Sequence, residues 1–175
     1  ITLYDAKKWM KLHDIAAAMT LEALMANMKP YDKRIHKLRG FSGSQIIANN
    51  LNILTEKSEI LFSGGKKVQD AYSMRSTPQV AGTLRDSINY AVSQVEIELN
   101  GVGDNPIFLT EEKDVLTGAN FQGSPIALPM EMIGTGLSMV AVLSERRMNR
   151  LTNPALSVGL PPFLAEKQGL HSGMM

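Results

Sequence analysis

The longest regular segment of this sequence is an amphipathic stretch that begins at Thr77-Pro78 and ends at Gly101. Thr77 is expected to cap a helix and Pro78 to occupy its first turn. Apolar residues recur along the segment every three or four positions, at Val80, Leu84, Ile88, Ala91, Val95, Leu99 and Val102. This period of about 3.67 residues per turn is typical of one face of an α-helix. The helix would be a rod of roughly 36 Å, too long for the core of a compact small domain, so the sequence predicts a bundle.

A second long helix is expected from Ser124-Pro125 to Arg150, ending before Asn153-Pro154. Ser124 and Pro125 again provide a cap followed by proline in the first turn. Pro129 lies close enough to the start to be tolerated or to produce a kink. The first two thirds of the segment are apolar on nearly every side. We therefore expect this helix to be central in the bundle.

The remaining segments are shorter. Helices are predicted over residues 4–28 and 42–59, with a basic segment over 31–41 and an irregular loop over 69–77. The residues at 63–67 are expected to form a polar, flexible break. Between the two long helices, Ile107-Phe108-Leu109 and Val115-Leu116 flank a charged turn, which predicts a short β-hairpin. The expected fold class is all-α, a long-helix bundle with one β-hairpin.

Composition excludes several function classes. The 175 residues carry 18 Lys and Arg against 17 Asp and Glu, so a basic surface dedicated to nucleic acid or an anionic membrane is not expected. The absence of cysteine excludes a disulfide scaffold, thiolate zinc ligands and thiol catalysis. The histidines His13, His36 and His171 match no metal-binding spacing, so no metal is expected. No apolar run is expected to approach the roughly 20 residues of a membrane span, and no secretory leader is expected, so a cytoplasmic location is the expectation.

The loop at 69–75 is the first candidate site. It crowds polar and aromatic groups, Gln69, Tyr72 and Arg75 among them, into an irregular segment delivered by a long helix. An arginine fork matches a carboxylate, and a tyrosine hydroxyl can donate or accept a proton. From these residues alone, a hydrogen-bonded structural loop is the favoured interpretation.

The second candidate is the turn Gly118–Gly123, which contains Phe121 and Gln122. It leads directly into the start of a helix, where backbone N–H groups can receive negative charge. The alternative is a plain connection between hairpin and helix. Asp104-Asn105-Pro106, just after the first long helix, would by itself be only a turn.

Five blocks of this sequence, in order, together resemble the family of histidine and phenylalanine ammonia-lyases and the related aminomutases. The blocks are Thr20–Leu24 with Asp32–His36, Val68–Arg75 with Thr77–Val80, Glu96–Glu98 through Asp104-Asn105-Pro106, Gly118–Gly123, and Leu143–Arg147 through Gly159–Leu164 to Gly169–Gly173. They cover nearly the whole chain. The resemblance implies the fumarase/aspartase-like helical fold and a homotetramer whose active sites combine loops from several subunits.

The resemblance also implies a reaction. Members of this family eliminate ammonia from an aromatic L-amino acid, giving a trans-α,β-unsaturated acid, or move the amine from the α to the β carbon. Their electrophile is a methylidene-imidazolone (MIO) ring formed from an internal Ala-Ser-Gly, a tripeptide that these 175 residues do not contain. Residues 1–175 are therefore expected to be the central portion of a larger lyase, without its N-terminal electrophile-bearing region and C-terminal helices, and to be inactive alone.

By the same resemblance, Tyr72 is the catalytic residue beside the electrophilic ring and Arg75 pairs with the substrate carboxylate. Gln69 and Asn105 would support that geometry by hydrogen bonds. Phe121 would pack against the ring or the substrate.

Substrate identity stays open among histidine, tyrosine and phenylalanine. Gln122 occupies a position that varies between subfamilies. Phe41–Gln45 replaces a His-x-Gly-Gln sequence that is common in the family, and Ser124 also departs from many histidine-type members.

Two alternatives lie outside this activity. The fumarase and aspartase group shares long helices, but its Gly-Ser-Ser-x-Met-Pro-x-Lys-x-Asn loop has no match in the sequence. A non-catalytic helical assembly module would use residues 69–75 only as a structural elbow.

Overall fold

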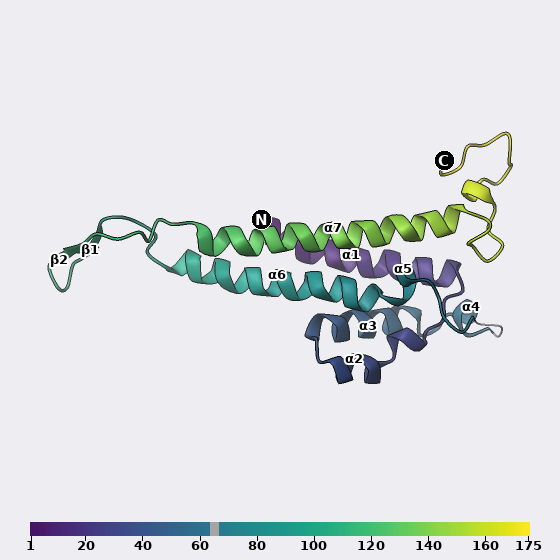
Figure 1. The fold of residues 1–175 in the computed structure, drawn as a ribbon, viewed down its shortest axis with the longest axis horizontal. Helices are drawn as coiled ribbons and strands as arrows, with labels where there is room; N and C mark the ends of the chain where they lie inside the picture. Colours follow the sequence, from purple (N-terminus) through teal and green to yellow (C-terminus); the bar gives the residue numbers. More distant parts are fainter. Residues whose placement is uncertain (64–66) are drawn as a thin grey trace.

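Long helices dominate the computed structural model, which describes residues 1–63 and 67–175 (Figure 1). The helices are α1 (Thr2–Ala23), α2 (Lys33–Arg39), α3 (Ser42–Thr55), α4 (Glu59–Phe62), α5 (Tyr72–Arg75), α6 (Thr77–Asn100) and α7 (Ser124–Thr152). Two short 3₁₀ turns, η1 (Lys29–Tyr31) and η2 (Pro162–Leu164), and a hairpin of β1 (Ile107–Leu109) and β2 (Asp114–Leu116) complete the described elements.

The rods α6 and α7 lie antiparallel, side by side, and α1 packs along both (Figure 1). Helix α3 packs against α6 on the other side, near its N-terminal half, and α2 lies beyond α3. The core is the seam between these helices, filled by side chains such as Leu21, Ile47, Leu84, Ile88 and Val140, each at most 2 % exposed. The hairpin projects beyond the far end of the α6–α7 pair.

The prediction of α6 is confirmed along its whole length, with Gly101 as the C-terminal cap. Its apolar stripe is buried from Leu84 to Ala91 but exposed at Leu99, which is 76 % accessible. The last turns of α6 extend past α1 and α3, and among the described residues this end of the stripe stays exposed.

The predicted side-chain caps of both long helices are wrong. Thr77 is already helical, and its hydroxyl donates backwards to the carbonyl of Met74 at 2.7 Å. Because only Ser76 lies between the end of α5 and the start of α6, Thr77 continues a helical turn instead of starting one. The cap of α7 is Gly123, not Ser124, and no side chain accepts from the first turn. Proline in the first turn is confirmed for both helices.

Three shorter segments differ from their predicted bounds. α1 ends at Ala23 because Met25 has a positive φ of 50° and the Ala26 N–H turns back to the carbonyl of Leu21. The predicted helix over 42–59 is divided into α3 and α4, since the Ser58 hydroxyl caps α4 by accepting from the Leu61 N–H. The loop at 69–77 contains α5. Of the expected polar break, residues 64–66 lie outside the described residues.

The expectation that α7 is central is not met within one chain. Only one stripe of it is buried, comprising Pro129, Ile133, Gly136, Val140, Leu143 and Arg147. Leu128 and Val142, on its other faces, are each 64 % exposed. By length and composition α7 is long and apolar enough to cross a membrane, a test that core helices of soluble proteins also pass. The expectation that no apolar run approaches the length of a membrane span is therefore wrong.

The backbones of α3 and α6 meet at a pair of glycines, Gly43 and Gly82. A Cβ atom on either residue would overlap backbone atoms of the opposite helix. The Gly43 N–H also donates to the Asp86 carboxylate at 2.8 Å, which fixes the register of the crossing. Glycine is therefore required at both positions for α3 to reach α6.

We predict that Gly82→Ala destabilises the protein by about 2 kcal/mol, since the added methyl group must push α3 away from α6. Thr83→Ala is the matched control, because Thr83 is exposed one residue further along the same helix. Its free energy of unfolding should stay within about 0.5 kcal/mol of wild type. Chemical denaturation of the full-length variants measures both, and equal midpoints would contradict the close crossing.

Candidate active site

The short helix α5 brings together three of the predicted site residues. The Arg75 Nη1 donates to the Gln69 Oε1 at 2.5 Å. The guanidinium carbon of Arg75 lies 4.3 Å from the centre of the Tyr72 ring, a cation–π contact. Tyr72 is 73 % exposed, so the other face of its ring and its hydroxyl are open to a ligand.

Arg75 has donor capacity left over. Its Nε atom is buried, yet it has no hydrogen-bond partner among the described residues. An unpaired buried donor is costly, and a carboxylate that accepts two parallel N–H bonds would relieve that cost. The arrangement of Gln69, Tyr72 and Arg75 therefore suits the binding of a small carboxylate next to an aromatic ring.

The segment before α5 is held by Asn27, which follows α1. The Asn27 backbone N–H donates to the Asp70 carboxylate at 2.6 Å. Its side-chain amide donates to the carbonyls of Lys67 and Val68, at 2.9 and 3.3 Å. Beside this segment lies a hollow of about 390 Å³, lined partly by Gln69, Asp70 and Arg150. The α5 turn that carries Arg75 therefore borders a hollow.

The other three predicted site residues lie around the hairpin. The Asn105 side-chain oxygen accepts from the Gly118 N–H at 2.8 Å, which ties the two ends of the hairpin together. Phe121 is 62 % exposed. Gln122 lines a second hollow, of about 520 Å³, between the end of α6 and the start of α7. These residues form a second group at the base of the hairpin.

The two groups do not meet within one chain. Gln69, Tyr72 and Arg75 lie at the N-terminal end of α6, whereas Asn105, Phe121 and Gln122 follow its C-terminal end (Figure 1). A helix of 24 residues separates them by roughly 36 Å. A site that uses all six residues must therefore combine parts of different chains.

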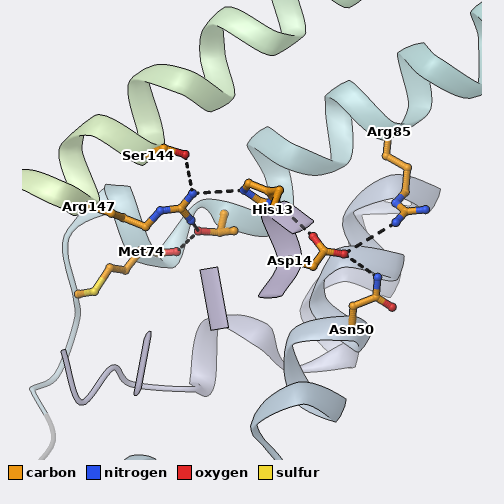
Figure 2. A network of polar contacts seen from close by, with 8 residues as sticks. His13, Asp14, Asn50, Met74, Arg85, Ser144 and Arg147 are labelled. Atoms are coloured by element: carbon orange, nitrogen blue, oxygen red, sulfur yellow. Dashed lines mark hydrogen bonds and ion pairs between the residues drawn. The ribbon is translucent and has the colours of Figure 1, made fainter. Parts of the chain in front are cut away.

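A buried polar network, not predicted from the sequence, lies behind α5 (Figure 2). Its centre is Arg147 of α7, which is 4 % exposed. The guanidinium donates to the Thr77 hydroxyl at 3.1 Å and to His13 Nε2 and the Ser144 hydroxyl, both at 3.2 Å. Burial lowers the pKa of the Arg147 guanidinium.

The hydrogen bonds determine the tautomer of His13. A guanidinium only donates, so His13 Nε2 accepts, and Nδ1 carries the proton that it donates to Asp14 at 3.1 Å. Asp14 in turn accepts from the Asn50 amide at 2.7 Å, and Arg85 lies 3.8 Å away. The imidazole thus separates the buried cation Arg147 from the buried carboxylate Asp14.

The helical spacing of His13 and Arg147 in the sequence indicates that both lie on buried helix faces. His13 falls on the buried stripe of α1 that includes Met10 and Ala17, and Arg147 follows Val140 and Leu143 on the buried stripe of α7. Polar residues at buried positions of a helix indicate partners across the core. Which partners they contact depends on three helices far apart in sequence.

Within the described ranges 1–63 and 67–175, no group of three His, Asp or Glu side chains could hold a metal ion.

The family model for aromatic amino acid lyases matches residues 1–175. The chain belongs to the aromatic amino acid lyase family.

Named relatives of this lyase chain support the assignment. It is 46 % identical over 176 residues to a histidine ammonia-lyase of Alkaliphilus oremlandii, covering all of this chain and 34 % of that protein. The solved histidine ammonia-lyase of Trypanosoma cruzi superposes with a TM-score of 0.86 at 36 % identity, over 99 % of this chain and 32 % of that one. The tyrosine aminomutase of Streptomyces globisporus gives 0.86 at 32 % identity, over 98 % and 36 %.

These similarities confirm the predicted fold class. The lyase chain has the fumarase-like, long-helix architecture of the ammonia-lyases and aminomutases. It spans about a third of the length of the curated relatives it matches, 34 % in the case of the Alkaliphilus oremlandii protein.

Proposed function

We propose that residues 1–175 are the central portion of an ammonia-lyase that eliminates ammonia from an aromatic L-amino acid. The products are ammonia and a trans-α,β-unsaturated acid. The observation that carries this proposal is the α5 turn, where a buried Arg75 donor has no partner among the described residues and lies beside the exposed ring of Tyr72. Histidine is the first substrate to test, because the Alkaliphilus oremlandii relative is named a histidine ammonia-lyase.

In this proposal, Arg75 holds the substrate carboxylate through its planar fork, and Gln69 orients that fork by accepting from Nη1. The Tyr72 hydroxyl exchanges a proton with the bound amino acid, since it is exposed within the reach of a ligand seated on Arg75. Asn105, Phe121 and Gln122 of another subunit would complete the pocket.

The electrophile is proposed to come from another segment of the enzyme, because the chain contains no Ala-Ser-Gly. The residues present fit a flat ring of the methylidene-imidazolone type: the Tyr72 and Phe121 rings are 73 % and 62 % exposed and present uncovered faces. When bound, such a group supplies an electrophilic carbon that makes the amino group a better leaving group. Tyr72, Phe121 and Asn105 would surround it.

Assembly is part of the proposal. The two groups of site residues lie at opposite ends of α6, and α7 exposes apolar side chains such as Leu128, Met139 and Val142. Packing such faces together in a homotetramer would bury them and bring the α5 turn of one chain to the hairpin of another. We also propose a cytoplasmic location.

A 2,3-aminomutase is the second candidate function. The tyrosine aminomutase of Streptomyces globisporus has the same TM-score, 0.86, as the histidine ammonia-lyase of Trypanosoma cruzi. Both reactions need a carboxylate clamp and a proton-exchanging group, so these residues serve either. Chiral chromatography would detect a β-amino acid where an aminomutase is at work.

The first prediction from this proposed function concerns the substrate. The full-length protein is expected to convert one of histidine, tyrosine or phenylalanine to an unsaturated acid, whose conjugated double bond absorbs in the ultraviolet. Absorbance and ammonia release are recorded for each amino acid. Residues 1–175 alone, the matched control, should be inactive, and lack of turnover by the full-length protein on all three substrates would overturn the proposal.

The second prediction is that Arg75→Lys raises KM about 10-fold or more and leaves the fold intact. Lysine keeps the charge but cannot form the bidentate pair with a carboxylate. Steady-state kinetics and circular dichroism measure the two effects. Arg39→Lys is the control, because Arg39 is exposed at the end of α2 and its guanidinium lies over the Phe41 ring. An unchanged KM for Arg75→Lys would remove this residue from the carboxylate role.

The third prediction tests the shared site. Tyr72→Phe and Phe121→Ala should each be nearly inactive alone, but their co-expression should restore activity. If each site takes its α5 turn and its hairpin from different chains, about a quarter of the sites in randomly mixed oligomers are intact. Two affinity tags isolate the mixed oligomers. Activity no higher than that of the single variants would show that one chain supplies both groups.

A further inference from the structure

The turn that carries Tyr72 and Arg75 is fixed through one backbone carbonyl. The carbonyl oxygen of Met74 accepts a hydrogen bond from the Tyr31 hydroxyl and another from the Thr77 hydroxyl, both at 2.7 Å. Met74 lies between Tyr72 and Arg75 in the sequence, and it is 4 % exposed. Any displacement of this carbonyl therefore moves the backbone of both proposed site residues.

Helix α5 cannot hold this geometry alone. It has four residues, and an isolated helix of that length is unstable because forming the first turn costs more than its few hydrogen bonds return. Its conformation must therefore come from contacts with other elements. The donors to Met74 belong to η1 and to the first residue of α6.

Arg147 extends the network to α7. The Thr77 hydroxyl uses its only proton for the Met74 carbonyl, so the Arg147 guanidinium donates to a lone pair of the Thr77 oxygen. This second bond sets the direction of the hydroxyl. His13 and Ser144 hold Arg147 from the other side, at 3.2 Å each.

The two hydroxyl groups that donate to the Met74 carbonyl are buried and keep their protons. Tyr31 is 1 % exposed, and its burial raises the pKa of the phenol well above its usual range, so the hydroxyl keeps its proton. Thr77 is fully buried. Stability alone does not call for polar groups here, because an apolar core of similar volume stabilises as well as a buried ionic one. Fully hydrogen-bonded networks do define one geometry.

We infer that Tyr31, Thr77 and Arg147 are positioning residues, which orient Arg75 and Tyr72 toward the substrate by holding the carbonyl of Met74. This inference rests on the proposed function for the roles of Arg75 and Tyr72. The network itself touches no substrate; it acts through the backbone of α5.

The test removes single hydroxyl groups from the full-length protein. Tyr31→Phe and Thr77→Val each delete one donor to Met74, whereas Thr77→Ser keeps the hydroxyl and is the conservative rescue. Tyr90→Phe is the matched control, since Tyr90 is exposed on α6. We expect kcat/KM to fall on the order of 10-fold for the first two variants, with KM raised, because a misplaced fork binds the carboxylate poorly. Thr77→Ser and Tyr90→Phe should stay within about twofold of wild type.

Hydrogen exchange gives a readout that does not depend on activity. In Tyr31→Phe, amides of residues 69–76 should exchange several-fold faster, while those of residues 84–96 in α6 keep their wild-type rates. Equal acceleration in both segments, or unchanged kcat/KM in both hydroxyl-deletion variants, would overturn the positioning role. If wild type shows no turnover on any of the three amino acids, the proposed function fails, and the exchange rates alone decide whether the network holds the turn.

Discussion

The unbroken hydrogen-bonded ladder of α6 is the constraint on which the rest of this architecture depends. A straight helix of 24 residues is a stiff spacer, so its two ends cannot approach each other by bending. One end adjoins the α5 turn, and the other leads to the hairpin with Phe121. The α3 crossing at Gly43 and Gly82 and the seam with α7 both keep this spacer straight. If the α5 turn and the hairpin serve one active site, the length of this one helix requires that they come from different subunits.

The surroundings of the α5 turn differ in kind from the rest of the core. Elsewhere the helices meet mainly through aliphatic side chains and the glycine crossing of α3 and α6, but behind α5 they meet through Arg147, His13 and Asp14, which are at most 6 % exposed. Burying ionisable groups costs desolvation energy, which is offset here only because almost every donor has an acceptor. An aliphatic core tolerates small shifts, whereas a set of directional bonds does not. The part of the core that tolerates displacement least therefore lies behind α5, which carries the proposed site residues Tyr72 and Arg75.

Local pattern predicted much of this molecule. The period of α6, the hairpin and the association of Gln69 with Tyr72 and Arg75 follow from residues close together in sequence or from the family resemblance. The bonds that pass through Thr77 were not predicted, because a threonine before proline reads as a cap unless the preceding α5 turn is known. The partners of Arg147 join segments 70 and 134 residues apart, and no periodicity specifies such pairs. The site roles themselves remain predictions.

The exposed apolar faces of α7 have a consequence for how this protein folds. If they are buried only between copies, the folded chain gains much of its stability from association, and that stability varies with protein concentration. Dilution would then lower the melting temperature as well as the activity. Newly synthesised chains would pass through a stage in which α7 is uncovered, when unspecific aggregation competes with correct assembly. Expression yield would be governed by how fast the copies find one another.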